Sequence, residues 1–394
     1  MGSSVDVAIV GAGPYGLSIA AHLRGRGVGF RIFGQLMDSW ARNMPAGMAL
    51  KSDGFASNLS DPGGRYTLEA YARAHGHPYS DLGWPVPLEV FTDYGRWFQS
   101  HAVPELEQTL VRRIERSGGG FVLTLDTGEE VSARRVVLAV GITHFRRIPE
   151  ELAALPSSLM SHSADHKDPG ALSGRDVVVL GAGASALDLA MLMGEAGVRV
   201  SVLARTTRLN FNVLGKLPRP LIEQLRWPTS GLGRGWPSFA YSHFPRLFRR
   251  LPASTRVGIV GRALGPSAGH TVRDRLEGKA PFLLGRRIAA ARPADGKLVL
   301  ELVDELGGRE ELRTDHLVAA TGYRPDVKRL DFLSEDIIGG LRTIEQSPAL
   351  SEAFESSVPG LHFVGLSAAN TFGPLLRFAY GADFTARHVA RRLA

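Results

Sequence analysis

The segment VAIVGAGPYGLSIAAHL carries Gly11, Gly13 and Gly16 directly after an apolar stretch, 5–10, that is typical of a buried strand. A helical pattern begins at Pro14. Glycines at this spacing permit a tight turn, let the backbone approach a pyrophosphate and seat the helix against the sheet. The phosphates then lie at the positive N-terminus of the helix. The segment therefore predicts a dinucleotide-binding loop.

A second segment of the same kind, VVVLGAGASALDLAML, begins 170 residues later. It has Gly181, Gly183, Ser185 and Ala186 after the apolar stretch 177–180. Its next expected strand, 198–204, ends before Arg205. Proteins that use NAD tend to place an acidic residue there on the ribose 2′-hydroxyl, whereas an arginine offers a charged, often bidentate contact to a 2′-phosphate. One chain is thus expected to bind two dinucleotides, and Arg205 favours the phosphorylated form for the second.

Strand–loop–helix units around both loops predict an α/β fold with two Rossmann-type domains. We expect further strands over 29–33, 135–140, which ends before Gly141, and 317–320, and helices over 67–74 and 90–101. Turn signals at 118–120 and 126–128 predict a β-ribbon, as does the pattern over 298–312. The segment 206–285 is rich in proline and aromatic residues. We expect helices there, which cover the active site or form a packing or dimer surface.

Composition excludes several classes of protein. The 394 residues are 44% hydrophobic and 22% charged, with no apolar run long enough to span a membrane. The first strand begins by Val5, which leaves no room for a signal peptide, so a cytoplasmic protein is expected. The net charge is +7, almost wholly from arginine, but no helix-turn-helix, zinc-finger or RNP-like pattern supports nucleic-acid binding. Two polyanionic cofactors explain the charge more simply.

Two further segments, ATGYRP ending at Pro325 and GLSAANTFGPLLR from Gly365 to Arg377, complete a resemblance over nearly the whole chain. With both glycine loops, the sequence resembles the flavin-dependent monooxygenases that use FAD and NADPH, the group of flavin-containing monooxygenases, N-hydroxylases and Baeyer–Villiger enzymes. The resemblance implies a glutathione-reductase-like architecture in which the NADPH domain is inserted into the FAD domain. The implied FAD domain is 1–155 with 315–394, and the NADPH domain is 170–314 with its insert, 206–285.

The resemblance also implies site residues. Gly11, Gly13, Pro14 and Gly16 would hold the FAD phosphates, and Asn370, Gly373 and Pro374 would border the flavin pyrimidine. Further cofactor contacts are implied for Trp40, Val111, Gly141, Gly322 and Gly365. Lys51, Ser52 and Asn58 join Trp40 and Asn370 as flavin-proximal candidates, although no single catalytic residue is identified. Ordinary core packing is the alternative for Trp40, and turn formation the alternative for the others.

Some positions depart from the family's pattern. Gly34 and Gln35 stand where many FAD sites carry a ribose-binding glutamate. In the fingerprint before the second loop, which resembles F-x-G-x-x-x-H followed by Tyr or Phe, only His162 fits, and His166 takes the aromatic place. His162 and His166 stand four residues apart, but without an H-E-x-x-H pattern and with Pro169 nearby we expect a loop and no metal site.

The chain has no cysteine, so it cannot exchange thiols with a disulfide or hold a thiolate-ligated iron–sulfur cluster. The resemblance then implies an NADPH-dependent FAD monooxygenase that forms a C4a-(hydro)peroxyflavin and oxygenates a small molecule. N- or S-hydroxylation is favoured, and C-hydroxylation and Baeyer–Villiger oxidation stay open. Expected partners are the substrate and molecular oxygen, with a homodimer possible. Two alternatives remain: an NADPH-dependent flavoprotein reductase that serves a protein or quinone, and a non-catalytic redox sensor.

Overall fold

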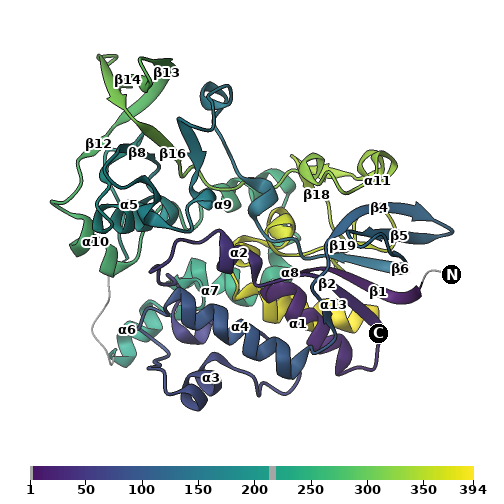
Figure 1. The fold of residues 1–394 in the computed structure, drawn as a ribbon. Helices are drawn as coiled ribbons and strands as arrows, with labels where there is room; N and C mark the ends of the chain where they lie inside the picture. Colours follow the sequence, from purple (N-terminus) through teal and green to yellow (C-terminus); the bar gives the residue numbers. More distant parts are fainter. Residues whose placement is uncertain (1–2, 213–218) are drawn as a thin grey trace.

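The computed structural model describes residues 3–212 and 219–394. Two largely parallel sheets, each with helices packed against it, are joined by two crossings of the chain, and a group of helices lies between and below them (Figure 1). Both described termini lie beside the first sheet. The predicted α/β class with two Rossmann-type units is confirmed.

The first sheet has the strand order β3-β2-β1-β6-β5-β4, and β19 also pairs with β6. All of its pairs are parallel except β4–β5 and β5–β6. Its strands are β1 (Ser3–Ala12), β2 (Phe30–Leu36), β3 (Leu106–Glu107), β4 (Val111–Ser117), β5 (Gly120–Leu125), β6 (Glu130–Leu138) and β19 (Leu361–Phe363). Strand β19 pairs Leu361 with Val136, so the C-terminal part of the chain returns to the first sheet.

Both faces of this sheet are covered. Val7, Ala8 and Ile9 of β1 are fully buried, as expected for a parallel strand with a continuous apolar run. Helices α1 and α13 pack against each other on the sheet. The helices of this domain are α1 (Pro14–Arg24), α2 (Asp38–Arg42), α3 (Leu68–His75), α4 (Leu88–Ala102), α11 (Glu335–Gly340), α12 (Ala369–Phe372) and α13 (Gly381–Leu393). The predicted helices over 67–74 and 90–101 are confirmed as α3 and α4, and the predicted ribbon as β4 and β5.

The second sheet is entirely parallel, in the order β12-β9-β8-β16-β7. Its strands are β7 (Met160–His162), β8 (Asp176–Leu180), β9 (Arg199–Ala204), β12 (Phe282–Leu284) and β16 (His316–Ala319). The domain boundary predicted at 315 is wrong in this respect: β16 pairs with β8 and β7. The chain therefore leaves the second sheet only after Ala319. Strand β7 was not predicted, because a loop was expected around His162 and His166.

One face of the second sheet packs on α5 (Ala184–Glu195), which buries Leu187, Leu189 and Met193. The other face has a separate core that includes Leu298, Leu300 and Leu302. These three residues belong to a three-stranded antiparallel sheet of β13 (Arg286–Ala294), β14 (Lys297–Asp304) and β15 (Arg309–Thr314). The ribbon predicted over 298–312 is thus confirmed, and it gains β13 as a third strand.

The described part of the 206–285 insert is largely helical, as predicted. Its helices are α6 (Leu221–Arg226), α7 (Trp236–His243), α8 (Pro245–Phe248), α9 (Ala253–Arg262) and α10 (His270–Leu276). Helix α10 packs on α5 of the second sheet, whereas α8 and α9 pack on α12 of the first domain. The insert therefore contacts both domains. Two short β-ribbons complete the structure, β10 (Thr229–Ser230) with β11 (Gly233–Arg234), and β17 (Thr343–Ile344) with β18 (Ser347–Pro348). Among the described residues, no helix is both long enough and apolar enough to cross a bilayer.

Candidate cofactor-binding and active site

The first glycine loop joins β1 to α1 and is open in front of the helix. A Cβ on Gly11 (φ +112°) would overlap the Ala139 carbonyl oxygen, and one on Gly16 would overlap the Gly11 carbonyl oxygen. A Cβ on Gly13 would meet no atom within 4 Å. Gly11 and Gly16 thus let strand and helix pack closely, while Gly13 leaves free space at the helix N-terminus. No acidic residue lies in the first turn of α1, so this space suits a pyrophosphate.

The second loop joins β8 to α5, in the same strand–loop–helix arrangement. A Cβ on Gly181 (φ +151°) would stand 2.5 Å from the Ala320 carbonyl oxygen. Gly183 is the N-cap of α5, whose first turn also lacks an acidic residue. Ala186 is fully buried, and Ser185 is exposed beside the loop. Arg205 follows the end of β9 and is exposed, so its guanidinium is free to reach a ligand held by this loop.

The two units also match at the end of the strand beside each loop, which is β6 in the first sheet and β16 in the second. Gly11 lies against the backbone of Ala139, and Gly181 lies against that of Ala320. Two residues beyond each alanine stands a glycine with a left-handed backbone, Gly141 (φ +70°) and Gly322 (φ +81°). The chain therefore turns in the same way beside each loop. Gly141 and Gly322, both implied as cofactor contacts, thus occupy equivalent positions in the two units.

The end of β2 carries no acidic residue for a ribose. Gly34 (φ +137°) approaches the first loop so closely that a Cβ on it would lie 3.2 Å from the Ala12 nitrogen. The Gln35 side chain donates from Nε2 to the Gln108 carbonyl oxygen at 2.8 Å, which ties β2 to the segment leading into Val111. Glycine at position 34 is thus required by close packing, and the Gln35 amide is already bonded to the protein.

The C-terminal segment lies against the first loop and the insert. Tyr15 donates from Oη to the Phe378 carbonyl oxygen at 2.8 Å, and its ring lies 3.6 Å from a Cβ placed on Gly365 (φ +65°). Asn370 is buried and donates from Nδ2 to Ser347 Oγ at 3.0 Å. A Cβ on Gly373 (φ +99°) would lie 3.1 Å from the Phe248 ring of α8.

Pro374, also buried, begins the short 3-10 turn that follows. The predicted pyrimidine neighbours are therefore held together, with Gly373 against the insert.

The other flavin-proximal candidates differ in what they contact. Trp40 is half-buried, with its ring edge against Phe91 at a centroid distance of 4.8 Å. Ser52 Oγ is bonded to Ser57 Oγ at 2.8 Å. Asn58 uses both ends of its amide, accepting from Leu68 N at 2.7 Å and donating to the Phe55 carbonyl oxygen at 3.0 Å. Ser52 and Asn58 thus stabilise the local chain, and of the candidates in this stretch only Lys51 reaches the other domain.

Lys51 crosses from the first domain to the insert. Its Nζ donates to the Ser267 carbonyl oxygen at 3.1 Å and also contacts Ser267 Oγ. The same stretch meets the second domain through Met48, which packs on its core, and through Gly47, where a Cβ would lie 3.3 Å from Leu192. The segment after Trp40 is therefore an ordered bridge between the domains. The irregular sequence gave no sign of this role.

Sequence reasoning did not find Asp188, which lies one turn into α5. Only 7% of it is exposed. Burial raises the pKa of its carboxyl to about 7, and the charges of Lys51 and Arg275 oppose that shift. Burial likewise lowers the pKa of Lys51, and the Asp188 charge opposes it. An acidic residue inside the helix of a dinucleotide loop was the only available signal. Since these two groups sense each other across the domains, the net charge of the pair depends on pH.

Arg256 of α9 was missed as well. It is buried, and its Nη1 donates to the Thr371 carbonyl oxygen at 3.2 Å, at the C-terminal end of α12. The contact joins the insert to the segment that carries Asn370 and Gly373. A guanidinium there suits the negative end of a helix. Nothing in the local sequence around Arg256 distinguishes it from the exposed arginines of the insert.

A cavity of about 670 Å³ lies away from both loops. It is lined by Asp176, Glu195, Arg199, Arg275 and Lys279, among others. Asp176 begins β8, whereas Gly181 follows the end of that strand, so cavity and loop lie at opposite ends of the sheet. In parallel α/β sheets, ligands bind at the carboxyl ends of the strands. The glycine loops, and not this cavity, are therefore the candidate cofactor site.

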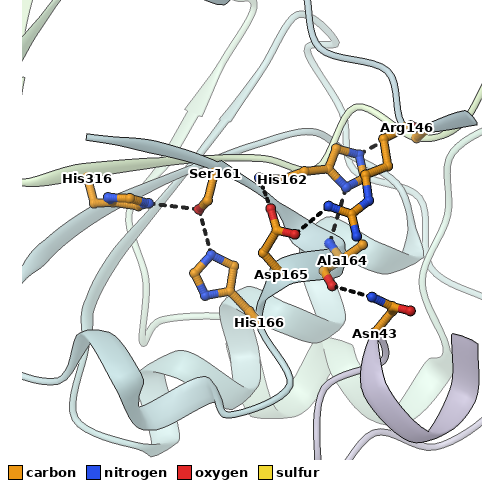
Figure 2. Close-up of polar contacts among 9 residues, drawn as sticks. Asn43, Arg146, Ser161, His162, Ala164, Asp165, His166 and His316 are labelled. Carbon is orange, nitrogen blue, oxygen red and sulfur yellow. Dashed lines mark hydrogen bonds and ion pairs between the residues drawn. The ribbon is translucent and has the colours of Figure 1, made fainter. Parts of the chain in front are cut away.

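The fingerprint histidines are associated with β7 of the second sheet: His162 ends this strand, and His166 lies four residues further (Figure 2). His162 Nε2 lies 3.3 Å from the Gly322 carbonyl oxygen in the second crossing, and its Nδ1 accepts from Ala164 N at 3.2 Å. Asp165 accepts from His162 N at 2.9 Å and pairs with Arg146, while Asn43 donates to the Ala164 carbonyl oxygen at 3.0 Å. These contacts fix both crossings to each other and to α2. The His162 ring is therefore a neutral Nε2–H tautomer with a structural role.

His166 faces a different partner. Ser161 Oγ lies 2.7 Å from His166 Nε2 and 2.7 Å from His316 Nε2. His316 Nδ1 lies 3.1 Å from the Ser158 carbonyl oxygen and must donate to it, so its Nε2 accepts the Ser161 hydrogen. His166 then donates to Ser161. The His316 ring is therefore neutral, and burial, which lowers the pKa of His166 to about 4 and also lowers that of His316, favours the neutral form of both. His162 and His166 thus face different partners, and His162 ends a strand where a loop was expected.

Comparison with known proteins places the chain among dinucleotide-dependent oxidoreductases. The model of the pyridine nucleotide-disulphide oxidoreductase family matches residues 8–222, more than half of the chain. The FAD-dependent urate hydroxylase of Xanthomonas campestris pv. campestris is 31% identical over 190 residues, which cover 43% of this chain and 40% of the relative. A ferredoxin–NADP reductase of Ignicoccus hospitalis is 25% identical over 203 residues, 51% of this chain and 56% of the relative. These alignments span about half the length of the two relatives.

A solved structure extends the likeness to the whole fold. The FAD-bound cadaverine monooxygenase of desferrioxamine biosynthesis from Erwinia amylovora has a TM-score of 0.77 and 18% identity. The match covers 100% of this chain and 95% of that one. Together, these comparisons confirm the resemblance, the oxidoreductase class and the predicted cofactors, FAD and NADPH. The chain is a member of the pyridine nucleotide-disulphide oxidoreductase family.

Proposed function

We propose that this protein is an NADPH-dependent FAD monooxygenase that oxygenates a small soft nucleophile, with nitrogen or sulfur as the favoured atom. The observation that carries the proposal is the pair of open glycine loops in a chain without cysteine. Two dinucleotides can be bound, but no thiol pair can receive the electrons. Molecular oxygen is then the natural acceptor. The fold shared with an amine monooxygenase, and the relative that hydroxylates urate, both support this choice.

The residues of each loop fit their proposed cofactor. Gly11, Gly13 and Gly16 would hold the FAD pyrophosphate at the N-terminus of α1, where a Cβ on Gly13 would fill the space. Gly181, Gly183 and Ser185 would hold the NADPH pyrophosphate at α5, and Arg205 its 2′-phosphate. Bound FAD would take a hydride from NADPH and supply the electrons that activate oxygen.

The chain's own groups would position the reactants and control the charge around them. Lys51 donates a hydrogen bond to Ser267 of the insert, and its ammonium group interacts electrostatically with Asp188. Asp188 can lose or hold a proton near neutral pH, so the net charge of this pair changes within the working range. Arg256 holds α9 on the segment that carries Asn370. These contacts would fix the insert over the flavin and limit the access of water.

A reductase that passes electrons to a separate protein or quinone is the second candidate, favoured by the ferredoxin–NADP reductase relative. The two functions differ in where the electrons go. We would incubate the purified flavoprotein with NADPH, oxygen and panels of amines, thioethers and ketones, and measure oxygenated product and hydrogen peroxide against NADPH consumed. Product in amounts close to the NADPH consumed with one substrate class would support the monooxygenase. Peroxide alone with every class, together with rapid reduction of ferredoxin or quinone, would favour the reductase.

A homodimer and a cytoplasmic location stay predictions. Sedimentation of the purified protein at several concentrations would test the first. Fractionation of cells that express the chain would test the second.

A further inference from the structure

Exposed apolar side chains are concentrated in the insert. Twelve large apolar residues are exposed among the described residues, and eight of them lie between positions 221 and 251. These eight, here called the insert apolar surface, are Leu221, Ile222, Leu225, Trp227, Trp236, Phe244, Leu247 and Leu251. Scattered single apolar residues on a surface are ordinary, whereas a group of this size marks a site of interaction.

Helix α6 shows this most strongly. Leu221, Ile222 and Leu225 are 77%, 81% and 73% exposed, and their spacing puts them on one side of the helix. The helix has only six residues, and isolated helices of this length are not stable in water. It stands at the margin of the molecule, away from both sheets (Figure 1). Its apolar side therefore has no partner within the described part of the chain.

A buried arginine holds α6 in place instead. The Arg219 side chain is only 3% exposed, although it lies at the start of this exposed segment. It pairs with Glu223 at 3.1 Å and donates to Thr229 Oγ1 at 2.9 Å and to the Trp227 carbonyl oxygen at 2.8 Å. These bonds tie residues 219–229 to one guanidinium group. The segment is thus ordered by polar contacts, and its apolar side chains stay available for a partner.

The surface continues from α6 onto α7 and α8. Gly235 (φ +102°) lies under the Trp227 ring, where a Cβ would stand 3.4 Å away, and Trp236 follows it directly. The Trp236 ring meets Phe239 edge-on at a centroid distance of 5.7 Å. Phe244 and Leu247 then extend the surface at the other end of α7. The exposed residues therefore lie on consecutive elements of the insert, from α6 to the end of α8.

The charge of residues 219–262 indicates which kind of partner binds the insert apolar surface. Residues 219–262 contain eight arginines and one glutamate, with no aspartate or lysine, a formal charge of +7. Arg226, Arg234, Arg246 and Arg250 are exposed beside the apolar residues. A second copy using the same surface would bring two sets of these exposed arginines together, which electrostatics opposes. An anionic partner is favoured.

We propose that the insert apolar surface docks on an anionic lipid bilayer. Leucine and isoleucine of α6 would enter the acyl boundary, the tryptophans would lie at headgroup depth, and the arginines would meet lipid phosphates. Protruding side chains on a short, separate helix suit insertion into lipid. Protein partners instead place their anchor residues in complementary pockets. The chain would thus be a peripheral membrane protein, whatever its substrate.

Vesicle co-sedimentation of the full-length protein tests this proposal. Vesicles of phosphatidylcholine with 30% phosphatidylglycerol should bind the protein at about 0.1 M salt, and pure phosphatidylcholine vesicles should bind it much less. Replacing Leu221, Ile222 and Leu225 together by serine should weaken partitioning by a factor of about ten or more. Leu306→Ser removes a residue that is 97% exposed but lies outside the surface, and it should have no effect. All four side chains are exposed, so folding should be unaffected, which circular dichroism would verify.

A charge variant separates the remaining outcomes. Arg226→Glu with Arg234→Glu should abolish the preference for phosphatidylglycerol, and raised salt should weaken binding by the wild type. No binding to either vesicle would overturn the proposal. So would binding that the triple serine variant leaves unchanged. Equal affinity for soluble polyglutamate would point to an acidic protein instead, and a dimer abolished by the triple variant would point to a second copy.

Discussion

The α-carbon of Gly16 lies directly against the carbonyl oxygen of Gly11, so that a Cβ at position 16 would overlap that oxygen. Gly13, between them in the same loop, faces open space. The two glycines therefore have different roles: Gly16 lets the helix pack on the strand, and Gly13 leaves room for a ligand. Substitution by alanine should separate these roles.

Gly16→Ala should destabilise the folded protein by about 1–3 kcal/mol, because strand and helix must move apart. Gly13→Ala should leave the stability of the apoprotein nearly unchanged, since φ at Gly13 is −90° and its Cβ would meet nothing, yet it should weaken FAD binding. Thermal unfolding of the apoproteins and titration with FAD would measure both effects. Unchanged FAD affinity in Gly13→Ala would contradict the assignment of this loop.

Arg205→Ala should weaken NADPH binding by about 1.5–3 kcal/mol, the contribution of a hydrogen bond to a charged group, and leave NADH binding nearly unchanged. Arg208, a second exposed arginine three residues further, offers a matched control. Arg208→Ala should alter neither coenzyme selectively. Titration of both coenzymes by calorimetry would give the two affinities. Equal losses for NADPH and NADH in Arg205→Ala would show that the 2′-phosphate is bound elsewhere.

Asp188 should make stability depend on pH in an unusual direction. Burial raises its pKa in the folded state to about 7, so the folded protein favours the protonated acid. Its contribution is fully favourable below the ordinary aspartate pKa and is lost as pH rises through about 7. Asp188→Asn should then raise the free energy of unfolding at pH 8 on the order of 2 kcal/mol and change it little at pH 4.

Denaturant unfolding at both pH values measures this effect. Glu195→Gln, on the same helix but exposed and paired with Arg275, serves as the control and should not stabilise the protein at pH 8. A stability profile of Asp188→Asn parallel to that of the wild type would mean that the carboxyl is ionised throughout.

Local patterns in the sequence were sufficient to predict both glycine loops, α3, α4 and the ribbons, because each depends on residues close together in the chain. Strand β7 was missed, since a three-residue strand between prolines becomes a strand only through its partner, β16, more than 150 positions away. The bonds from Lys51 to Ser267 and from Ser161 to His316 have the same origin. Asn58 fits the flavin neighbourhood by position, but its amide is committed to backbone groups that only the fold reveals.

His166 should make the protein sensitive to acid. Burial, and to a lesser extent the charge of His316, lower the pKa of His166 in the folded state to about 4. The folded protein therefore favours the neutral ring, whereas the unfolded chain takes up a proton near the ordinary histidine pKa of 6.5. Its contribution to stability is present above pH 6.5 and is lost as pH falls toward 4.

The loss should be on the order of 2–3 kcal/mol between pH 7 and pH 4. His166→Gln keeps an N–H donor for Ser161 but cannot titrate, so it should flatten this decline without a large loss at pH 7. His101→Gln replaces an exposed histidine and should leave the decline unchanged. Urea unfolding at half-unit steps of pH would resolve the difference. If His166→Gln declines as steeply as the wild type, the acid sensitivity arises elsewhere, and His316 becomes the group to replace next.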